Sequence, residues 1–143
     1  MSIWHHSPPL EELNALIDGT IMRPLGIAFI EVGVDFIRAA MPVDERTRQP
    51  YGLLHGGASV ALAETVGSTG ANLCVDATRY VCSGQEINAN HVRAVRAGLV
   101  TATARPLHLG GRSQVWSIEI VNEAGLLSCV SRLTMAVLER KTP

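Results

Sequence analysis

The sequence has few charged residues, few aromatic residues and no arginine-rich block. Charged residues make up 17% of the 143 residues, aromatic residues 4%, and the formal net charge is −1. A nucleic-acid-binding domain normally presents a basic face, so this class of protein is disfavoured. Cysteine is also scarce, and no two of Cys74, Cys82 and Cys129 have metal-ligand spacing. We therefore expect reduced core thiols rather than a disulfide framework or a metal site.

Long apolar runs and targeting features are also missing. No uninterrupted apolar run approaches about 20 residues, so we expect no membrane-spanning helix. The first residues are polar and lead into Pro8 and Pro9, unlike the apolar stretch of a signal peptide. These observations predict a cytoplasmic protein. Hydrophobic residues nevertheless make up 47% of the chain, which indicates that apolar surface is hidden between subunits.

Hydrophobic periodicity and turn signals predict one short helix, one long helix and six strands. The predicted helices cover residues 8–17 and about 56–73, and the predicted strands cover residues 26–32, 35–41, 80–93, 99–105, 113–121 and 126–138. Residues 44–52 are polar and irregular, and residues 139–143 form a polar tail. Since we find no repeat or linker, we predict one domain over residues 1–143.

The long helix carries a single charged side chain, Glu64, among apolar, small and hydroxylic residues. A helix that is apolar on nearly every face is usually buried, so we expect an antiparallel sheet curled around it and a second subunit over the remainder. Burying an ionised carboxylate is costly unless the group is paired, shifted in pKa or functional. Nine residues earlier, His55-Gly56-Gly57 opens the helix with an imidazole and two backbone N–H groups.

This arrangement favours acyl chemistry. N–H groups at a helix N-terminus can stabilise an oxyanion, while a carboxylate acts as nucleophile or general base. Structural interpretations stay open: Glu64 could hold a hydrogen-bond network, His55 could cap the helix, and residues 108–112 could be a hairpin turn. A serine hydrolase is disfavoured, because Ser59 and Ser68 have no nearby His–Asp arrangement and no nucleophile-elbow motif surrounds Ser59.

Several segments together resemble the hotdog-fold thioesterases, the superfamily of the 4-hydroxybenzoyl-CoA thioesterases. The segments are residues 41–44, 46–59, 63–64, 86–91 and 106–110. The resemblance covers nearly the whole chain and is greatest to the subgroup of 1,4-dihydroxy-2-naphthoyl-CoA hydrolases and enterobactin proofreading thioesterases. It implies an α+β hotdog fold, with an antiparallel sheet curled around one long central helix.

The resemblance also implies the roles of individual residues. Glu64 matches the catalytic carboxylate, and Ser68 matches a hydroxyl that places water. Gln49 and His55 match the residues that hold the thioester end. The Gly56 N–H matches the group that polarises the carbonyl. The residues that match coenzyme A or substrate contacts are Gly84, His91, Val92, Arg93, Ala94, His108, Leu109, Gly110, Gly111, Arg112 and Ser113. Gly111 departs from the family pattern, because relatives carry a bulkier polar residue there.

We therefore expect hydrolysis of an acyl-CoA or aroyl-CoA thioester to the free acid and CoA, without a metal or cofactor. Alternatives are proofreading of thioesters on an aryl carrier protein, a non-catalytic acyl-CoA-binding regulator, and a hydratase on the same fold. The resemblance implies a homodimer that pairs again into a homotetramer. In that dimer, Glu64 of one subunit would meet Gln49, His55 and Gly56 of the other.

Overall fold

The computed structural model describes residues 1–141; residues 142–143, the end of the predicted polar tail, lie outside the described residues. The helices are α1 (Leu10–Ala15), α2 (Met22–Leu25) and α3 (Gly56–Leu73), and the strands are β1 (Ala28–Val32), β2 (Ile37–Pro42), β3 (Tyr80–His91), β4 (Leu99–Leu109), β5 (Ser113–Val121) and β6 (Leu127–Glu139). Among these residues, no helix is long and apolar enough to cross a membrane.

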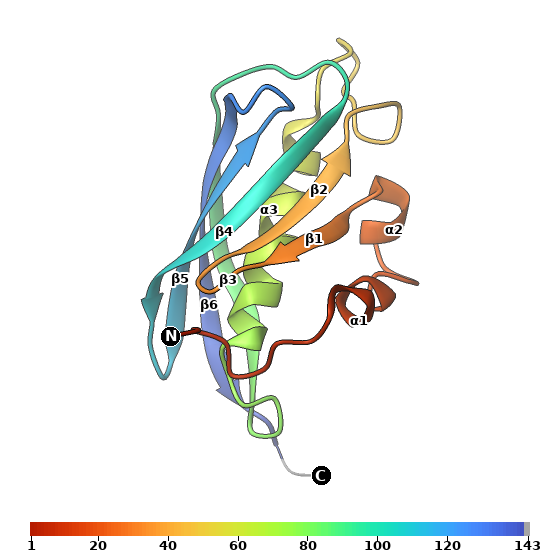
Figure 1. The fold of residues 1–143 in the computed structure, drawn as a ribbon. Helices are drawn as coiled ribbons and strands as arrows, with labels where there is room; N and C mark the ends of the chain where they lie inside the picture. Colours follow the sequence, from red (N-terminus) through yellow and green to blue (C-terminus); the bar gives the residue numbers. More distant parts are fainter. Residues whose placement is uncertain (142–143) are drawn as a thin grey trace.

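The strands form a six-stranded sheet in the order β1-β2-β4-β5-β6-β3, and every neighbouring pair is antiparallel. The sheet curls around α3, while α1 and α2 lie beside the helix next to β1 (Figure 1). This is the α+β hotdog fold that the sequence predicts. Strands β1 and β3 lie at the two edges, so each has a single strand partner within residues 1–141.

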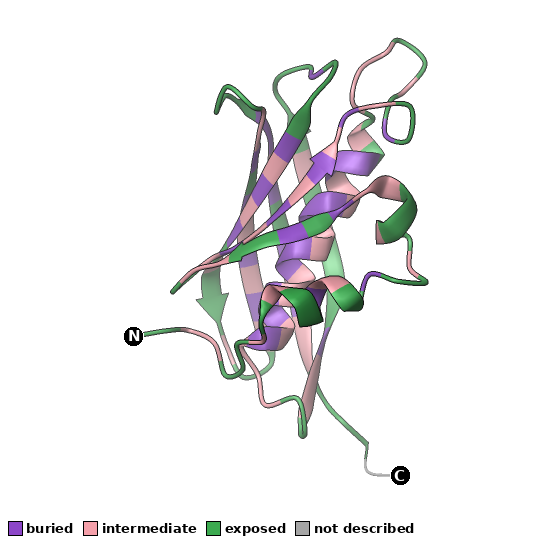
Figure 2. Cartoon of the chain, turned by 45° about the vertical axis from the view of Figure 1, so that its right-hand side comes forward, coloured by how far each residue is buried: buried purple, intermediate pink, exposed green. Residues whose placement is uncertain are grey.

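The core lies between α3 and the concave face of the sheet. Leu62 and Val66 of α3 are fully buried, as are Trp116, Ile118 and Leu133 of the strands. Buried residues alternate along β5, because successive side chains of a strand point to opposite faces. Figure 2 shows the buried residues concentrated on α3 and on the strands around it. Truncating one of these large side chains to alanine should cost about 2–5 kcal/mol of unfolding free energy.

Small residues allow α3 to lie close to the sheet. A Cβ atom added at Gly67 would lie 2.7 Å from Cδ2 of Leu133, and one added at Gly70 would lie 2.9 Å from the Trp116 ring. Real Cβ contacts are longer, so a larger side chain at either position would push the helix away from the strands. The small residues of the sequence therefore set the depth at which α3 lies.

The N-terminal segment closes the C-terminal end of α3. The Trp4 ring stacks on Trp116 with the ring centroids 6.2 Å apart, and the Trp4 indole N–H donates to the Gly33 carbonyl over 2.6 Å. The backbone N–H groups of His5 and His6 both donate to the Leu73 carbonyl, at 2.8 and 3.1 Å. These bonds satisfy a carbonyl that the end of a helix would otherwise leave without a partner.

Two segments differ from the sequence prediction. Helix α2 was not predicted; it is only four residues long and ends at Gly26, whose φ of +72° is left-handed. Strand β4 was predicted to end at Arg105, yet it continues to Leu109. Its register with β5 shifts between Pro106 and His108, so a bulge accommodates the proline. His108 and Leu109 are therefore strand residues, and only residues 110–112 form the turn.

The remaining boundaries differ from the predicted ones by three residues or fewer. Strand β3 ends at His91, two residues before the predicted end, and Glu139 belongs to β6, where it pairs with Tyr80. The three cysteines are free thiols; Cys82 and Cys129 are buried and Cys74 is half-buried. Burial raises the pKa of Cys74 to about 12 and raises the pKa values of the other two thiols.

Candidate active site

His55 is the N-cap residue of α3, and its two ring nitrogens have separate environments. Nδ1 accepts a hydrogen bond from the Gly57 backbone N–H at 2.8 Å. In a neutral imidazole, the accepting nitrogen carries no proton, so the proton lies on Nε2. His55 therefore caps the helix and still offers an Nε2–H donor at an exposed position.

The next residue, Gly56, has a backbone N–H with no hydrogen-bond partner among residues 1–141. The first N–H groups of a helix point out along its axis and carry the positive end of the helix dipole. Gly56 is half-buried. This N–H can therefore donate to a carbonyl oxygen brought to the helix start, which is the role that the family resemblance implies for it.

A folded loop before α3 holds Gln49 in place. The Gln49 backbone N–H donates to the Leu53 carbonyl at 2.8 Å, and the His55 N–H donates to the Thr47 carbonyl at 2.8 Å. The side-chain oxygen of Gln49 accepts from the Tyr51 N–H. With its oxygen engaged, the Gln49 side chain retains its NH₂ group as a donor for a ligand.

The start of this loop is held by an ion pair and a hydroxyl. Arg46 contacts the Asp44 carboxylate at 2.7 Å, and this bond lowers the pKa of Asp44 to about 2. The Thr47 hydroxyl donates to the Pro42 carbonyl at 2.7 Å, which ties the loop to the end of β2. Thr47 is buried, so the loop that carries Gln49 is anchored to the core.

A cavity of about 220 Å³ adjoins the start of α3. Its lining residues are Gln49, Leu53, Leu54, Ser59, His91, Arg93, Ala94 and Ser128. The His91 ring lies over Gly56, since a Cβ atom added at Gly56 would lie 2.9 Å from Nε2 of His91. Ser128 holds the segment after β3, because its carbonyl accepts the N–H of Val92 at 2.8 Å and its hydroxyl donates to the Arg93 carbonyl at 3.1 Å.

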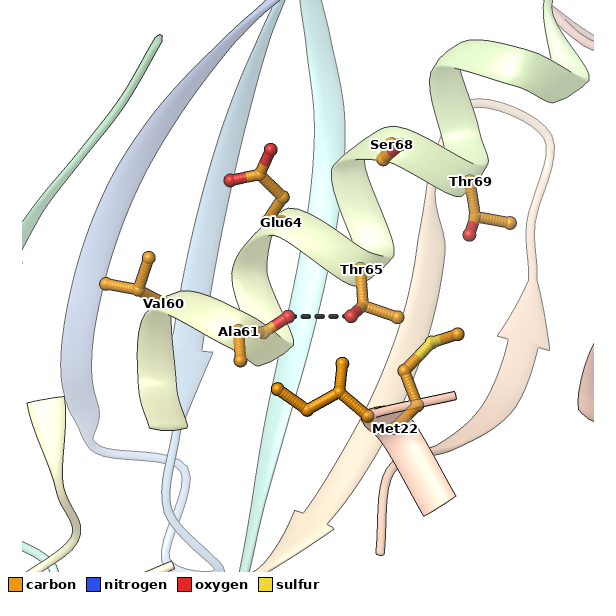
Figure 3. Close-up of a pocket in the computed structure, with 8 residues that line it drawn as sticks. Met22, Val60, Ala61, Glu64, Thr65, Ser68 and Thr69 are labelled. Atoms are coloured by element: carbon orange, nitrogen blue, oxygen red, sulfur yellow. Dashed lines mark hydrogen bonds between the residues drawn. The ribbon is translucent and has the colours of Figure 1, made fainter. Parts of the chain in front are cut away.

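Glu64 lines a second cavity, of about 390 Å³, which lies between α3 and the segment of Ile21 and Met22. Glu64 and Ser68 project from successive turns on the same side of the helix, whereas Thr65 and Thr69 lie nearer Met22 (Figure 3). Within residues 1–141, the Glu64 carboxylate forms no hydrogen bond and no ion pair. Glu64 is half-buried rather than buried as the sequence predicts, because one chain covers only part of the helix.

The hairpin between β4 and β5 contributes a third group of the expected contact residues. The Gly110 N–H donates to the Ser113 carbonyl at 2.9 Å, and the Arg112 carbonyl accepts the Val137 N–H at 2.9 Å. The Arg112 side chain is exposed, as are His108, Leu109 and Gly111. Neither of the two cavities above includes a residue of this hairpin.

The structure thus divides the expected site residues into three groups within one chain. Gln49, His55, Gly56, His91, Arg93 and Ala94 gather around the start of α3, Glu64 and Ser68 lie further along the helix, and residues 108–113 form the hairpin. Gly84 of β3 lies opposite Glu64. Eight residues separate Gly56 from Glu64, which is roughly 12 Å along the helix axis, and the Gly56 N–H points away from Glu64.

Sequence reasoning assigned no site role to ten of the sixteen residues that line the two cavities, and four of them show why. Ile21 and Met22 form part of the wall beside Glu64, and they lie in or next to α2, the helix that the sequence did not predict. Ser59 could have been found, because it follows His55 by four residues and so shares its side of the helix. Ser128 reaches its cavity by strand pairing, for which the local sequence has no signal.

The fold is that of the thioesterase superfamily, whose family model matches residues 51–129. The chain belongs to this superfamily and is a thioester hydrolase. It is 54% identical over 136 residues to 1,4-dihydroxy-2-naphthoyl-CoA hydrolase of Escherichia coli K12, an alignment that covers 95% of this chain and 99% of that protein. The resemblance seen in the sequence is therefore confirmed.

Two further relatives agree with this family. The proofreading thioesterase EntH of Cronobacter sakazakii is 50% identical over 136 residues, which cover 95% of this chain and 98% of that protein. The crystal structure of thioesterase PA1618 from Pseudomonas aeruginosa, solved as a glutamine-to-alanine mutant, matches with a TM-score of 0.96 and 50% identity. That comparison covers 97% of this chain and 100% of the other.

Proposed function

We propose that this thioesterase hydrolyses an acyl-CoA or aroyl-CoA thioester, with Glu64 as the catalytic carboxylate. The observation that supports this role most directly is the Glu64 side chain, which lines a cavity and has no hydrogen-bond or ion-pair partner within residues 1–141. A structural carboxylate on an apolar helix would normally be paired. Membership of a family of hydrolases favours this function over a non-catalytic acyl-CoA-binding regulator.

In the proposed reaction, the Gly56 N–H donates to the thioester carbonyl oxygen and strengthens its bond as negative charge develops there. The Nε2–H of His55 and the NH₂ group of Gln49 hold the thioester end. Glu64 either attacks the carbonyl carbon, to give an anhydride that water then hydrolyses, or removes a proton from an attacking water. Ser68, one helical turn from Glu64, positions that water. The carbon–sulfur bond breaks and the CoA thiolate leaves.

The site is completed by a second copy of the chain. An oxyanion donor must lie about 3 Å from the oxygen, and the attacking group must lie about 3–3.5 Å from the carbon. Glu64 and Gly56 of one chain are too far apart for this, and the Gly56 N–H points the other way. The edge strand β3, twelve residues long with β6 as its strand partner, offers unpaired backbone groups to a partner.

The substrate class follows from the relatives and from the chemistry of the donors. One relative is named a 1,4-dihydroxy-2-naphthoyl-CoA hydrolase, so we expect an aroyl group in preference to a long aliphatic chain. No step requires a metal or an organic cofactor, and coenzyme A enters as part of the substrate. A carrier-protein thioester is the second candidate substrate, since its pantetheine arm is the same as that of CoA.

A panel of thioesters tests the proposal. Release of free thiol should be followed with benzoyl-CoA, a hydroxylated aroyl-CoA, a long-chain acyl-CoA and an aryl carrier-protein thioester. We expect the largest kcat/KM for an aroyl thioester, and Glu64→Gln should lower kcat by about 10²–10⁴ because the amide can neither attack nor accept the proton. A Glu64→Gln protein with the parental kcat would remove Glu64 from the mechanism.

The composite site predicts complementation between two impaired variants. Gln49→Ala homodimers should keep about a tenth of the parental activity and Glu64→Gln homodimers about a hundredth or less, but a mixed dimer contains one site in which both residues are intact. Random exchange after joint refolding should therefore restore about a quarter of the parental activity, because half the dimers are mixed and each has one intact site. If the mixture stays as inactive as its components, each site lies within one chain.

A further inference from the structure

One oxygen of the Glu64 carboxylate lies beside a strand residue that has no side chain. A Cβ atom built on Gly84 of β3 would lie 2.3 Å from Oε1 of Glu64 and 3.5 Å from its Cδ. The next nearest atom to that position is Sδ of Met135, at 3.9 Å. The space that a side chain at residue 84 would fill is therefore occupied by one oxygen of Glu64.

The alternation of side chains along β3 directs residue 84 toward the helix, and a β-bulge follows it. Gly84 pairs with Met135 and Glu86 with Thr134, so Gln85 has no partner residue in β6. Cys82, two residues before Gly84, is buried in the core, and residues two apart on a strand share a face. After the bulge this face continues at Ile87 and Ala89, which pack on the core. Gly84 therefore faces inward by its alternation with Cys82, and the bulge after it keeps Glu86 off that face.

We infer that Gly84 is a positioning residue for the Glu64 carboxylate, an inference that rests on the proposed function. Since no hydrogen bond or ion pair fixes the carboxylate within residues 1–141, its direction depends on the surfaces around it. The bare backbone of β3 at Gly84 lets Oε1 lie against the strand. The absence of a side chain at Gly84 sets where the reactive oxygen stands relative to the thioester. The bulge beside it fits the frequent occurrence of bulges next to active sites.

Alanine at residue 84 should therefore move Glu64 and leave the fold intact. The crowded atom is the end of a flexible side chain, so the carboxylate can turn aside while the strand keeps its place. A normal carbon–oxygen contact requires a shift of about 1 Å, and a misplacement of this size can lower the rate of an enzyme by 10²-fold. We expect Gly84→Ala to reduce kcat by about 10- to 100-fold, with a thermal midpoint close to that of the parent and a small change in KM.

The test combines kinetics with a crystal structure. Gly84→Ala should be measured alone and in the Glu64→Asp and Glu64→Gln backgrounds. Aspartate is one methylene shorter and leaves room for the methyl group. The factor by which Gly84→Ala lowers kcat should therefore be much smaller in the Glu64→Asp background. In the Glu64→Gln background, the residual rate should not fall further. The crystal structure of Gly84→Ala should show the Glu64 carboxylate displaced from β3.

Gly67→Ala is the matched control. Residue 67 lies on the same helix, and its added methyl would meet Cδ2 of Leu133 at 2.7 Å, so it perturbs packing without touching Glu64. We expect a lower thermal midpoint and a smaller loss of kcat than for Gly84→Ala. The inference is overturned if Gly84→Ala keeps the parental kcat. It is also overturned if Gly84→Ala lowers kcat by the same factor in the parent, in Glu64→Asp and in Glu64→Gln. If Glu64→Gln itself keeps the parental kcat, the proposed function of Glu64 fails instead.

Discussion

Substitutions at His55 can separate helix capping from thioester binding, because each function uses a different ring nitrogen. Nδ1 accepts the Gly57 N–H at 2.8 Å, while Nε2–H faces away from that bond. Asparagine places a carbonyl oxygen at the position of Nδ1 and is among the most favourable N-cap residues. It has no group at the position of Nε2. Alanine removes both functions.

The expected changes in stability and in kcat/KM follow from the groups that each substitution removes. His55→Ala loses the side-chain cap and should lower the free energy of unfolding by about 1 kcal/mol, whereas His55→Asn should change it by only a few tenths. Both variants lose the Nε2–H donor. A hydrogen bond to the thioester is worth about 1.4 kcal/mol in the transition state, so kcat/KM should fall about tenfold in both. Stability and activity should thus respond differently to the same pair of substitutions.

Urea unfolding measures the first quantity, and thiol release from an aroyl-CoA measures the second. We expect His55→Asn to keep the parental stability and to lose kcat/KM. We expect His55→Ala to be less stable and to lose kcat/KM by the same factor. The reasoning is refuted if His55→Asn recovers the parental kcat/KM together with the parental stability. In that case His55 acts as a cap alone, and the thioester end is held by Gln49 and Gly56 without it.

Three further predictions concern the CoA contacts, the assembly and the thiols. Arg112→Ala should raise KM for CoA substrates more than it lowers kcat, and the effect should shrink for a pantetheine thioester that lacks the nucleotide phosphates; equal losses on both substrates would place the nucleotide elsewhere. Sedimentation should detect a dimer or tetramer at every concentration that shows activity, and an active monomer would contradict the composite site. Burial raises the pKa of Cys74 to about 12, whereas the unfolded thiol ionises at about pH 8.5. Folding stability should therefore hold below about pH 8.5 and decline as the pH rises from there toward 12. Cys74→Ala should flatten this decline in urea titrations.

The fold could be predicted well because its strongest signals are local. Helix α3 was predicted over residues 56–73, as observed, because its start is marked by the His55 cap and two glycines. The errors occur where long-range pairing overrides local composition. Strand β4 was predicted to end at Arg105, yet the shift of register beside Pro106 lets it continue to Leu109. Helix α2 is too short for any periodicity to be visible.

The site could be predicted only in part, for the same reason. Gln49, His55, Gly56 and Glu64 stand in motifs that the sequence displays directly. The approach of Glu64 to Gly84 joins two residues 20 positions apart, and it depends on the curvature of the sheet, which no sequence signal marks. Likewise, nothing near residue 91 indicates that its ring covers Gly56.

The stacked indoles at the base of α3 have a practical consequence. The chain has two tryptophans, and Trp4 and Trp116 lie with ring centroids 6.2 Å apart and ring planes inclined by 11°. One belongs to the N-terminal segment and the other is fully buried in β5. Two indoles so close couple excitonically, so near-ultraviolet circular dichroism and intrinsic fluorescence report whether the N-terminal segment is docked. The protein thereby carries its own optical probe, which can follow detachment of that segment separately from melting of the sheet without any added label.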